Sequence, residues 1–147
     1  MDKIVVDSNI LFSAILNLDS NIGQILINEG KRFDFYAPKY ARTELLNHKN
    51  KILKITGLTD DEFLEIYDLI LKNVILLNHS ILPKKDFKKA LAYCQDIDPD
   101  DTIFVAFSEY LNAKLWTGDN KLIKGLKSKG FNEVVTTKDI IENLGEE

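Results

Sequence analysis

Short apolar runs alternate with helix-like segments along this chain, and no other feature restricts its possible folds as strongly. Residues 4–6 are Ile-Val-Val, and a wholly apolar, β-branched run of this kind is typical of a strand buried on both faces. Further strands are predicted at residues 33–37, 73–77, 114–117 and 133–136. Helices are predicted at residues 10–18, 21–28, 87–93, 99–111 and 121–127, with one more after Pro38 and a longer one behind a capping-box pattern at Thr59.

Repeated strand–helix units of this kind predict a three-layer α/β/α fold. Its central sheet is expected to contain four or five mostly parallel strands, because parallel neighbours need a crossover such as a helix between them. A length of 147 residues suits one domain that spans residues 1–147. In folds of this class ligands bind outside the carboxyl ends of the strands, so candidate functional residues are sought there.

Composition excludes several classes of protein. The chain has one cysteine, Cys94, and therefore neither an intramolecular disulfide nor a Cys-rich zinc cluster. No apolar run approaches the ~18 residues that cross a bilayer, and the first residues carry no signal-peptide pattern, so we expect a cytoplasmic protein without a membrane partner. The net charge of −4 does not mark an obvious nucleic-acid-binding protein.

Two of the predicted strands are followed closely by a carboxylate. Asp7 comes directly after residues 4–6, and Asp119 comes after residues 114–117 and one glycine. In a parallel sheet the two side chains would emerge at the same edge. An aspartate after a strand is also an ordinary helix N-cap, so each residue has a structural as well as a functional interpretation.

Two more acidic residues are candidates for the same edge. Asp101 ends an acidic stretch in which Asp98 and Pro99 are typical of the first turn of a helix. Glu44 lies in the helix predicted after the second strand, where a lone glutamate is most often solvated surface. Like charges ~4 Å apart repel by about 4 kcal/mol near a protein surface, so converging carboxylates would indicate a bound cation. Mg²⁺ and Mn²⁺ prefer such hard oxygen ligands.

In their order and spacing these residues resemble the PIN-domain family of metal-dependent nucleases. The resemblance covers nearly the whole chain and rests on the segments Ile4 to Leu11, Pro38 to Leu45, Asp101 to Ser108 and Leu115 to Asp119. The interval from Asp101 to Asp119 is similar to the family's usual spacing, which favours Asp101 over Asp98 and Asp100.

The resemblance implies an endoribonuclease that hydrolyses RNA phosphodiester bonds with Mg²⁺ or Mn²⁺. The carboxylates that it implies as catalytic and metal-binding residues are Asp7, Glu44, Asp101 and Asp119. Two polar companions are expected beside them. Asn9 would hydrogen-bond Asp7 or a water on the metal, and Thr117 would do the same beside Asp119.

Many small single-domain members of this family are toxins of toxin–antitoxin pairs, and this chain is little longer than the domain. By resemblance, the expected partners are an RNA substrate, an antitoxin protein that lies across the active edge, and a second copy of the chain in a homodimer.

Other functions stay open from the sequence alone. One is a catalytically inert PIN-like module that binds RNA or protein. Another is a nuclease that acts in RNA processing or on DNA, outside toxin–antitoxin systems. Aspartyl-phosphate phosphatases also place an aspartate after their first strand, but they carry a second one two residues later, where this chain has Asn9.

Basic residues that could contact an anionic substrate follow Asp119. Lys121 and Lys124 are the candidates, because salt-dependent phosphate contacts would orient a nucleic-acid strand. The alternative is that they are solvated surface lysines with buried stems. His48 and His79 are too isolated in the sequence for a metal triad or a general-base pair and are assigned no role.

Overall fold

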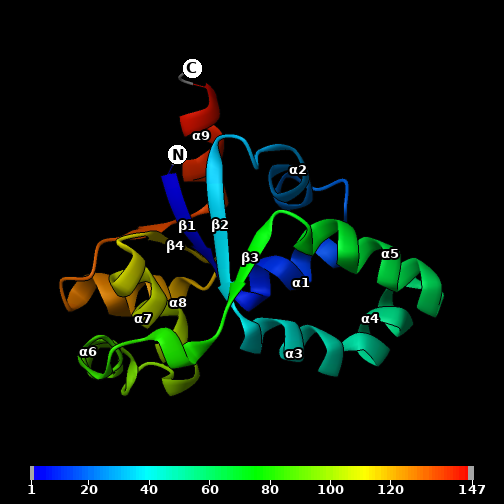
Figure 1. Ribbon diagram of the computed structural model, residues 1–147. Helices are drawn as coiled ribbons and strands as arrows, with labels where there is room; N and C mark the ends of the chain where they lie inside the picture. Colours follow the sequence, from blue (N-terminus) through cyan, green and yellow to red (C-terminus); the bar gives the residue numbers. More distant parts are fainter. Residues whose placement is uncertain (1, 146–147) are drawn as a thin grey trace.

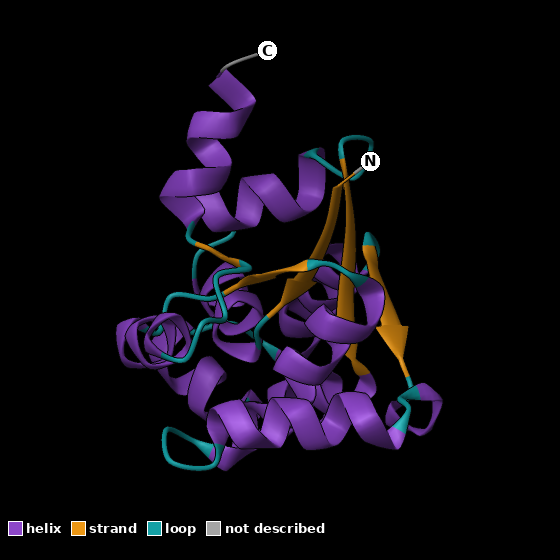
Figure 2. Ribbon diagram, turned by 90° about the vertical axis from the view of Figure 1, so that its left-hand side faces the viewer, coloured by secondary structure: helices purple, strands orange, loops and turns teal. Residues whose placement is uncertain are grey.

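A computed structural model describes residues 2–145 and shows a parallel sheet with helices on both of its faces (Figure 1, Figure 2). The strands are β1 (Asp2–Val6), β2 (Phe33–Pro38), β3 (Val74–Leu77), β4 (Lys114–Trp116) and β5 (Val134–Val135). They lie in the order β3-β2-β1-β4-β5, and every neighbouring pair is parallel. The predicted α/β fold is confirmed, with five strands and no antiparallel member in the described sheet.

The helices form two groups that cover the sheet. Their bounds are α1 (Ser8–Leu16), α2 (Asn21–Asn28), α3 (Lys39–Asn47), α4 (Lys49–Thr56), α5 (Asp60–Leu71), α6 (Lys84–Cys94), α7 (Thr102–Leu111), α8 (Asn120–Ser128) and α9 (Thr137–Gly145). Two 3₁₀ turns, η1 (His79–Ile81) and η2 (Pro99–Asp101), precede α6 and α7. Helix α1 packs against α2, α3, α4 and α5, whereas α7 packs against α6 and contacts β1, β2 and β4.

The core explains why the strands are so apolar. Ile4, Val5 and Val6 are all buried, as expected for a strand covered on both faces. The rings of Phe35 on β2 and Trp116 on β4 have their centroids 6.1 Å apart, so aromatic packing crosses the middle of the sheet.

The strand order places a switch point beside β1. From β1 the chain passes through α1 and α2 to β2 on one side, and it returns much later to β4 on the other side. The backbone N–H of Asp7 donates to the carbonyl oxygen of Trp116 at 3.0 Å, which extends the pairing one residue past β1. Crevices at such switch points are the usual ligand sites of parallel α/β folds.

Two helices were not predicted from the sequence. Helix α4 has eight residues, and His48 at its N-terminus makes no capping hydrogen bond with its side chain. It ends at Gly57, whose φ of 74° is unstrained for glycine. Helix α9 begins after Thr136, whose backbone N–H donates to Asp139 Oδ2 at 2.9 Å while its Oγ1 accepts from the Asp139 N–H at 3.2 Å. This reciprocal pair is a capping box with Asp in the place of Glu, a signal that the sequence does carry.

Several element boundaries differ from the predictions. The helix predicted at residues 10–18 begins at Ser8 and ends at Leu16. The strand predicted at residues 133–136 narrows to Val134–Val135. The helix predicted at residues 99–111 is divided into η2 and α7, because Pro99 opens a separate 3₁₀ turn capped by Asp98. The capping box at Thr59 and Glu62 is confirmed at the start of α5.

Within residues 2–145, no single helix combines the length and apolar character needed to cross a membrane. Helices α1 and α2 reach that length and composition only as a pair, with an angle of 104° between them.

Candidate active site

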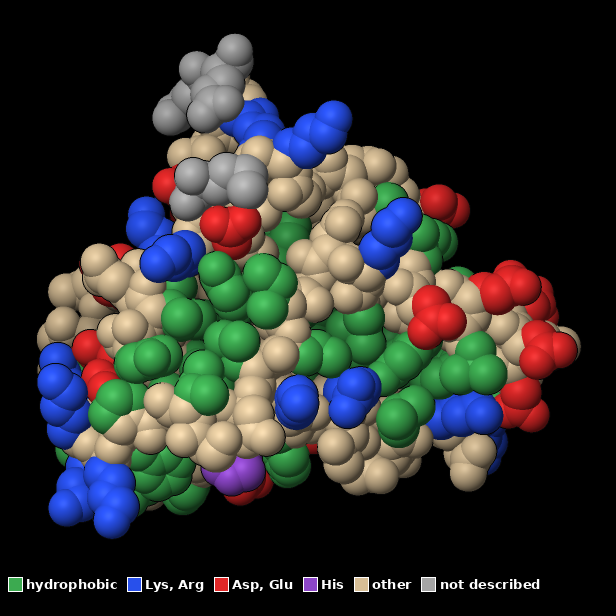
Figure 3. Space-filling model, viewed as in Figure 1, with side chains coloured by type: hydrophobic (Ala, Val, Ile, Leu, Met, Phe, Trp, Pro, Cys, Tyr) green, Lys and Arg blue, Asp and Glu red, His purple; other side chains and the backbone are tan. Residues whose placement is uncertain are grey.

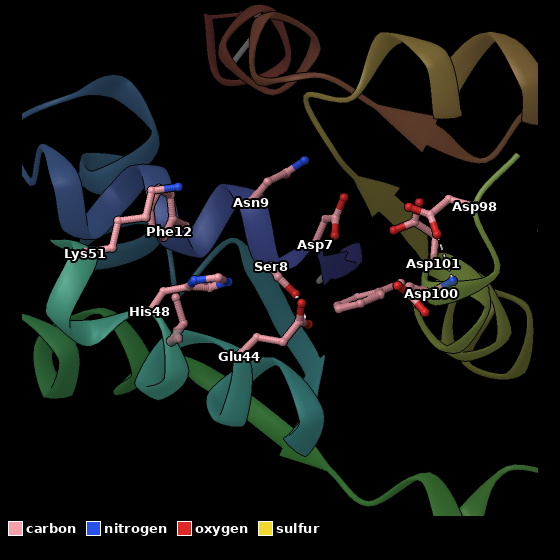
Figure 4. Close-up of a pocket in the computed structure, with 12 residues that line it drawn as sticks. Asp7, Ser8, Asn9, Phe12, Glu44, His48, Lys51, Asp98, Asp100 and Asp101 are labelled. Carbon is pink, nitrogen blue, oxygen red and sulfur yellow. Dashed lines mark hydrogen bonds between the residues drawn. The ribbon is translucent and has the colours of Figure 1, made fainter.

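The carboxyl end of the sheet opens into a pocket of about 320 Å³ (Figure 4). Residues of α1, α3, α4, η2 and α7 line it. The carboxylates in its lining are Asp7, Glu44, Asp98, Asp100 and Asp101. The fold therefore brings three of the four predicted acidic residues, which are far apart in sequence, to one pocket.

Asp7 is the most deeply placed carboxylate of the pocket. It stands between β1 and α1 and is only 5% exposed. Asp7 occupies the N-cap position of α1, but its side chain makes no capping hydrogen bond, so the carboxylate does not cap the helix. Burial raises the pKa of Asp7 to about 6; a hydrogen bond from Thr117 opposes that shift, and the charges of Glu44 and Asp119 add to it.

Asp101 faces Asp7 from the other side of the pocket (Figure 4). It is half-buried at the end of η2, and burial followed by the charge of Asp7 raises its pKa to about 7. Asp98 and Asp100 are exposed, and Asp98 Oδ1 accepts from the Asp100 N–H at 3.0 Å, as a helix cap does. The choice of Asp101 among the acids of this stretch is therefore consistent with its burial and its raised pKa.

Glu44 reaches the pocket from α3, where it is half-buried. Ser8, the first residue of α1, donates from Oγ to Glu44 Oε1 at 2.6 Å. This hydrogen bond joins α1 to α3 through two residues that are 36 positions apart in sequence. Sequence reasoning assigned Ser8 no role, although it stands next to Asp7 in the first motif.

Asp119 has the structural role that its position after a strand suggested. Its Oδ1 accepts from the backbone N–H groups of Lys121 at 3.0 Å and Leu122 at 3.2 Å and so caps α8. It does not line the pocket, but its charge contributes to the raised pKa of both Asp7 and Asp101. Among the described residues no hydrogen bond to its Oδ2 occurs, so that oxygen is not used in the cap.

The two predicted polar companions differ in their contacts. Thr117 is fully buried and donates from Oγ1 to Asp7 Oδ2 at 2.7 Å, while the same oxygen accepts from the Asp119 N–H at 3.2 Å. Thr117 therefore hydrogen-bonds to Asp7 directly and links the ends of β1 and β4. Asn9 is exposed and lines the pocket, and no hydrogen bond between Asn9 and Asp7 occurs in residues 2–145.

The basic residues in the pocket lining are not the predicted ones. Lys121 and Lys124 are exposed on α8 and lie outside the lining. His48 and Lys51 line the pocket instead. Helical spacing from Glu44 could have indicated His48, because residues four apart share one face of a helix.

The donor set fits a divalent cation held partly through water. No three His, Cys, Asp or Glu side chains among residues 2–145 are placed as a complete metal-binding group. Mg²⁺, however, is usually held by one or two protein carboxylates and keeps several waters. The raised pKa values of Asp7 and Asp101 indicate carboxylates whose negative charge is poorly compensated by the protein, which is the condition that a bound cation would relieve.

The Thr117 hydroxyl should control the ionisation of Asp7. In Thr117→Val we expect the pKa of Asp7 to rise further above its ordinary value, because the bond that favours the ionised carboxylate is lost. A carbon-13 NMR titration of the aspartate carboxyl groups measures this shift. Thr117→Ser keeps the hydroxyl and should leave the titration near that of the native chain. An unchanged titration in the valine variant would show that the bond has no such effect.

Comparison with known proteins places the chain in a family. Residues 5–139 match the model of the PIN domain. No curated protein matches the sequence. Solved structures with a similar fold include VapBC2 from Rickettsia felis bound to a DNA fragment from their promoter, where the match has 15% identity, a TM-score of 0.66, and 91% of this chain and 96% of that chain covered.

Two further structures share the fold. A toxin–antitoxin complex from Klebsiella pneumoniae matches with 16% identity and a TM-score of 0.61, covering 91% of this chain and 97% of that chain. PAE2754 from Pyrobaculum aerophilum matches with 14% identity and a TM-score of 0.66, covering 99% of this chain and 91% of that chain. Because the family model spans nearly the whole sequence, the chain belongs to the PIN-domain family.

Proposed function

We propose that this protein is a Mg²⁺- or Mn²⁺-dependent endoribonuclease. The observation that carries the proposal is the convergence of Asp7, Glu44 and Asp101 from three separate elements on one pocket, with the pKa values of the two aspartates raised to about 6 and about 7. Perturbed carboxylates gathered in a cleft are typical of catalytic sites. Membership of a family of nucleases supports the same reaction class.

Each side chain has a distinct part in the proposed site. Asp7 and Asp101 present oxygen ligands from opposite sides, and Asp119 adds one at the edge. Thr117 orients Asp7, and Ser8 orients Glu44 toward the pocket. A bound divalent cation would neutralise these carboxylates and supply Lewis acidity toward a phosphodiester. Lys121 and Lys124 remain candidates for phosphate contacts outside the pocket.

We further propose that the protein is the toxin of a toxin–antitoxin pair. The similar fold from Klebsiella pneumoniae belongs to a toxin–antitoxin complex, which supports an antitoxin partner for this chain. Apolar side chains also gather on the face that carries β2 and β3 (Figure 3). Exposed apolar residues include Ile75 on the edge strand β3, Ile81 and Phe87. An antitoxin or a second copy of the chain would cover such residues.

The direct test is cleavage of a single-stranded RNA by the purified chain. We expect cleavage with Mg²⁺ or Mn²⁺, none with a chelator present, and none of a DNA of the same sequence. Cleavage of DNA alone would favour a DNA-acting nuclease. No cleavage of either substrate would favour the inert module.

Glu44→Gln should lower the rate of this cleavage by at least about tenfold, because the amide keeps the shape of the side chain but loses its charge. Ser8→Ala should give a smaller loss, since Glu44 keeps its carboxylate and loses only its orienting bond. Initial rates at saturating metal measure both effects. Glu142→Gln on the exposed face of α9 is the matched control and should cleave normally. Normal rates in Glu44→Gln would remove this residue from the site.

A further inference from the structure

The pocket continues past its carboxylates to a group with different chemistry. Figure 4 shows Lys51, Phe12 and His48 at one end and Asp98, Asp100 and Asp101 at the other, with Asp7, Ser8 and Glu44 between them. The group Phe12, His48 and Lys51 is called here the aromatic–basic end. The proposed cleavage chemistry uses none of these three side chains.

Helical periodicity places the aromatic–basic end next to the proposed catalytic residues. Phe12 is four residues after Ser8 on α1, and His48 is four residues after Glu44 at the end of α3. Each pair therefore shares one helix face, about one turn or roughly 5.4 Å apart along the axis. Lys51 follows three residues after His48, in the first turn of α4. A ligand that passes Glu44 along the pocket meets this end next.

Contacts within the aromatic–basic end order its side chains. The rings of Phe12 and His48 pack edge to face, with centroids 6.0 Å apart and planes at 76°. Lys51 Nζ lies 5.9 Å from the centroid of the Phe12 ring, close enough for a cation–π contact. Phe12 is half-buried against the core, which fixes its position, while His48 and Lys51 are exposed.

Lys51 makes no ion pair with another described residue. Lys49, two residues earlier, pairs with Asp60 at 2.9 Å, whereas the ion pairs of residues 2–145 do not include Lys51. The ammonium of Lys51 is thus a cation held over an aromatic ring at the mouth of an acidic pocket. The contact with Phe12 holds the ammonium in place, and no carboxylate of the described residues neutralises it.

We propose that the aromatic–basic end binds a nucleotide of a single-stranded RNA beside the scissile bond. Lys51 contacts a backbone phosphate, and the flanking base stacks on the Phe12 ring. His48, whose ring plane is at 76° to that of Phe12, borders the base at its side. Stacking on aromatic side chains combined with cationic backbone contacts is the usual physics of single-strand recognition. The carboxylates at the other end repel phosphate unless a cation is present, so a separate anchor at this end sets the direction of the strand. This inference rests on the proposed endoribonuclease function.

Binding can be measured without cleavage. In an Asp101→Asn background, a fluorescein-labelled single-stranded RNA is titrated with protein, and anisotropy is recorded at several salt concentrations. Lys51→Gln should weaken binding and reduce the slope of log affinity against log salt by about 0.7, the loss of one phosphate contact. Lys51→Arg should restore both. Lys54→Gln, also exposed on α4 but outside the pocket, is the matched control and should behave as the background.

The stacking contact is tested by Phe12. Phe12→Leu keeps an apolar side chain in the partly buried position and should weaken binding about fivefold, the lower end of the range for a lost base stack. Its salt slope should stay that of the background, because no phosphate contact is removed. Phe12→Tyr should retain binding. Melting temperatures of all variants show that differences in affinity do not come from unfolding.

The outcomes separate the two proposals. If the native chain cleaves RNA but Lys51→Gln and Phe12→Leu bind it as the background does, the nucleotide subsite is wrong and the nuclease stands. If the native chain neither cleaves nor binds RNA, both proposals are overturned. Equal loss of affinity in Lys51→Gln and Lys54→Gln would indicate general surface charge and overturn the subsite.

Discussion

Asp7→Asn is expected to abolish RNA cleavage while making the protein more stable at neutral pH. Asparagine keeps the size and one oxygen of the side chain but cannot carry the negative charge that the proposed chemistry needs. The expected loss in rate is at least about a hundredfold, which is the lower end of the rate loss seen when a catalytic side chain is removed. The substrate and metal conditions are those of the cleavage assay described above.

The gain in stability follows from the pKa of Asp7. Burial raises that pKa from the ordinary 3.8 to about 6, so the native state resists an ionisation that the unfolded state undergoes freely. At pH 7 the ionised carboxylate therefore lowers the free energy of unfolding by up to about 3 kcal/mol relative to a neutral side chain. In a chain of this length the variant should melt up to roughly 6–12 °C higher in the absence of metal.

A second acidic residue provides a control in which the same substitution should lower the stability. Asp139 caps α9 through its reciprocal bonds with Thr136, and those bonds lower its pKa. Asp139→Asn should therefore be less stable than the native chain at pH 7 and should cleave RNA normally. If Asp7→Asn instead unfolds, Asp7 holds the fold together and its proposed role in the site is wrong.

A rise in pH should lower the melting temperature of the metal-free protein, and a divalent metal should raise it. The pKa values of Asp7 and Asp101 are raised in the native state to about 6 and about 7. While both groups are protonated, at low pH, they do not destabilise the native state. As the pH rises from about 4 to about 7 they ionise less readily in the native than in the unfolded state, so the free energy of unfolding falls. Without metal, the melting temperature should fall through that window. A metal that binds only the native state at 100 times its Kd adds about 2.7 kcal/mol, or roughly 5–10 °C, at neutral pH.

Thermal melting at several pH values, with a chelator or with Mn²⁺, measures both effects. Near pH 4 the carboxyl groups of Asp7 and Asp101 are protonated in the native state, so Mn²⁺ should have little effect there. The double variant Asp7→Asn/Asp101→Asn should lose most of the dependence on both variables. An equal Mn²⁺ effect in the native chain and the double variant would place metal binding elsewhere on the protein.

The layer architecture and the carboxylates could be predicted because they depend on local patterns. Apolar β-branched runs require buried strands, and a parallel sheet brings residues that follow its strands to one edge. The position of Asp7 follows from this rule alone. Asp101 and Glu44 lie on helices, and only their order and spacing, compared with a known family, indicated them.

The contacts between side chains could not be predicted in the same way. The bond from Ser8 to Glu44 depends on how α1 and α3 are placed against each other, and the bond from Thr117 to Asp7 depends on the register of β1 and β4. Helix α4 was not predicted because it has only eight residues and no side chain caps its N-terminus at His48. Without α4, nothing in the sequence brings Lys51 to the pocket.

The backbone bond between Asp7 and Trp116 has a mechanical consequence for the whole domain. Trp116 Nε1 also donates to Thr137 Oγ1 at 3.1 Å, so a chain of bonds runs from the deepest carboxylate through β4 to the first residue of the C-terminal helix. Asp7 is thereby tied to the central strands β1 and β4, whereas Glu44 and Asp101 stand on helical segments that flank the sheet. A ligand that bridges the three carboxylates would therefore join the central strands to both flanking helical segments.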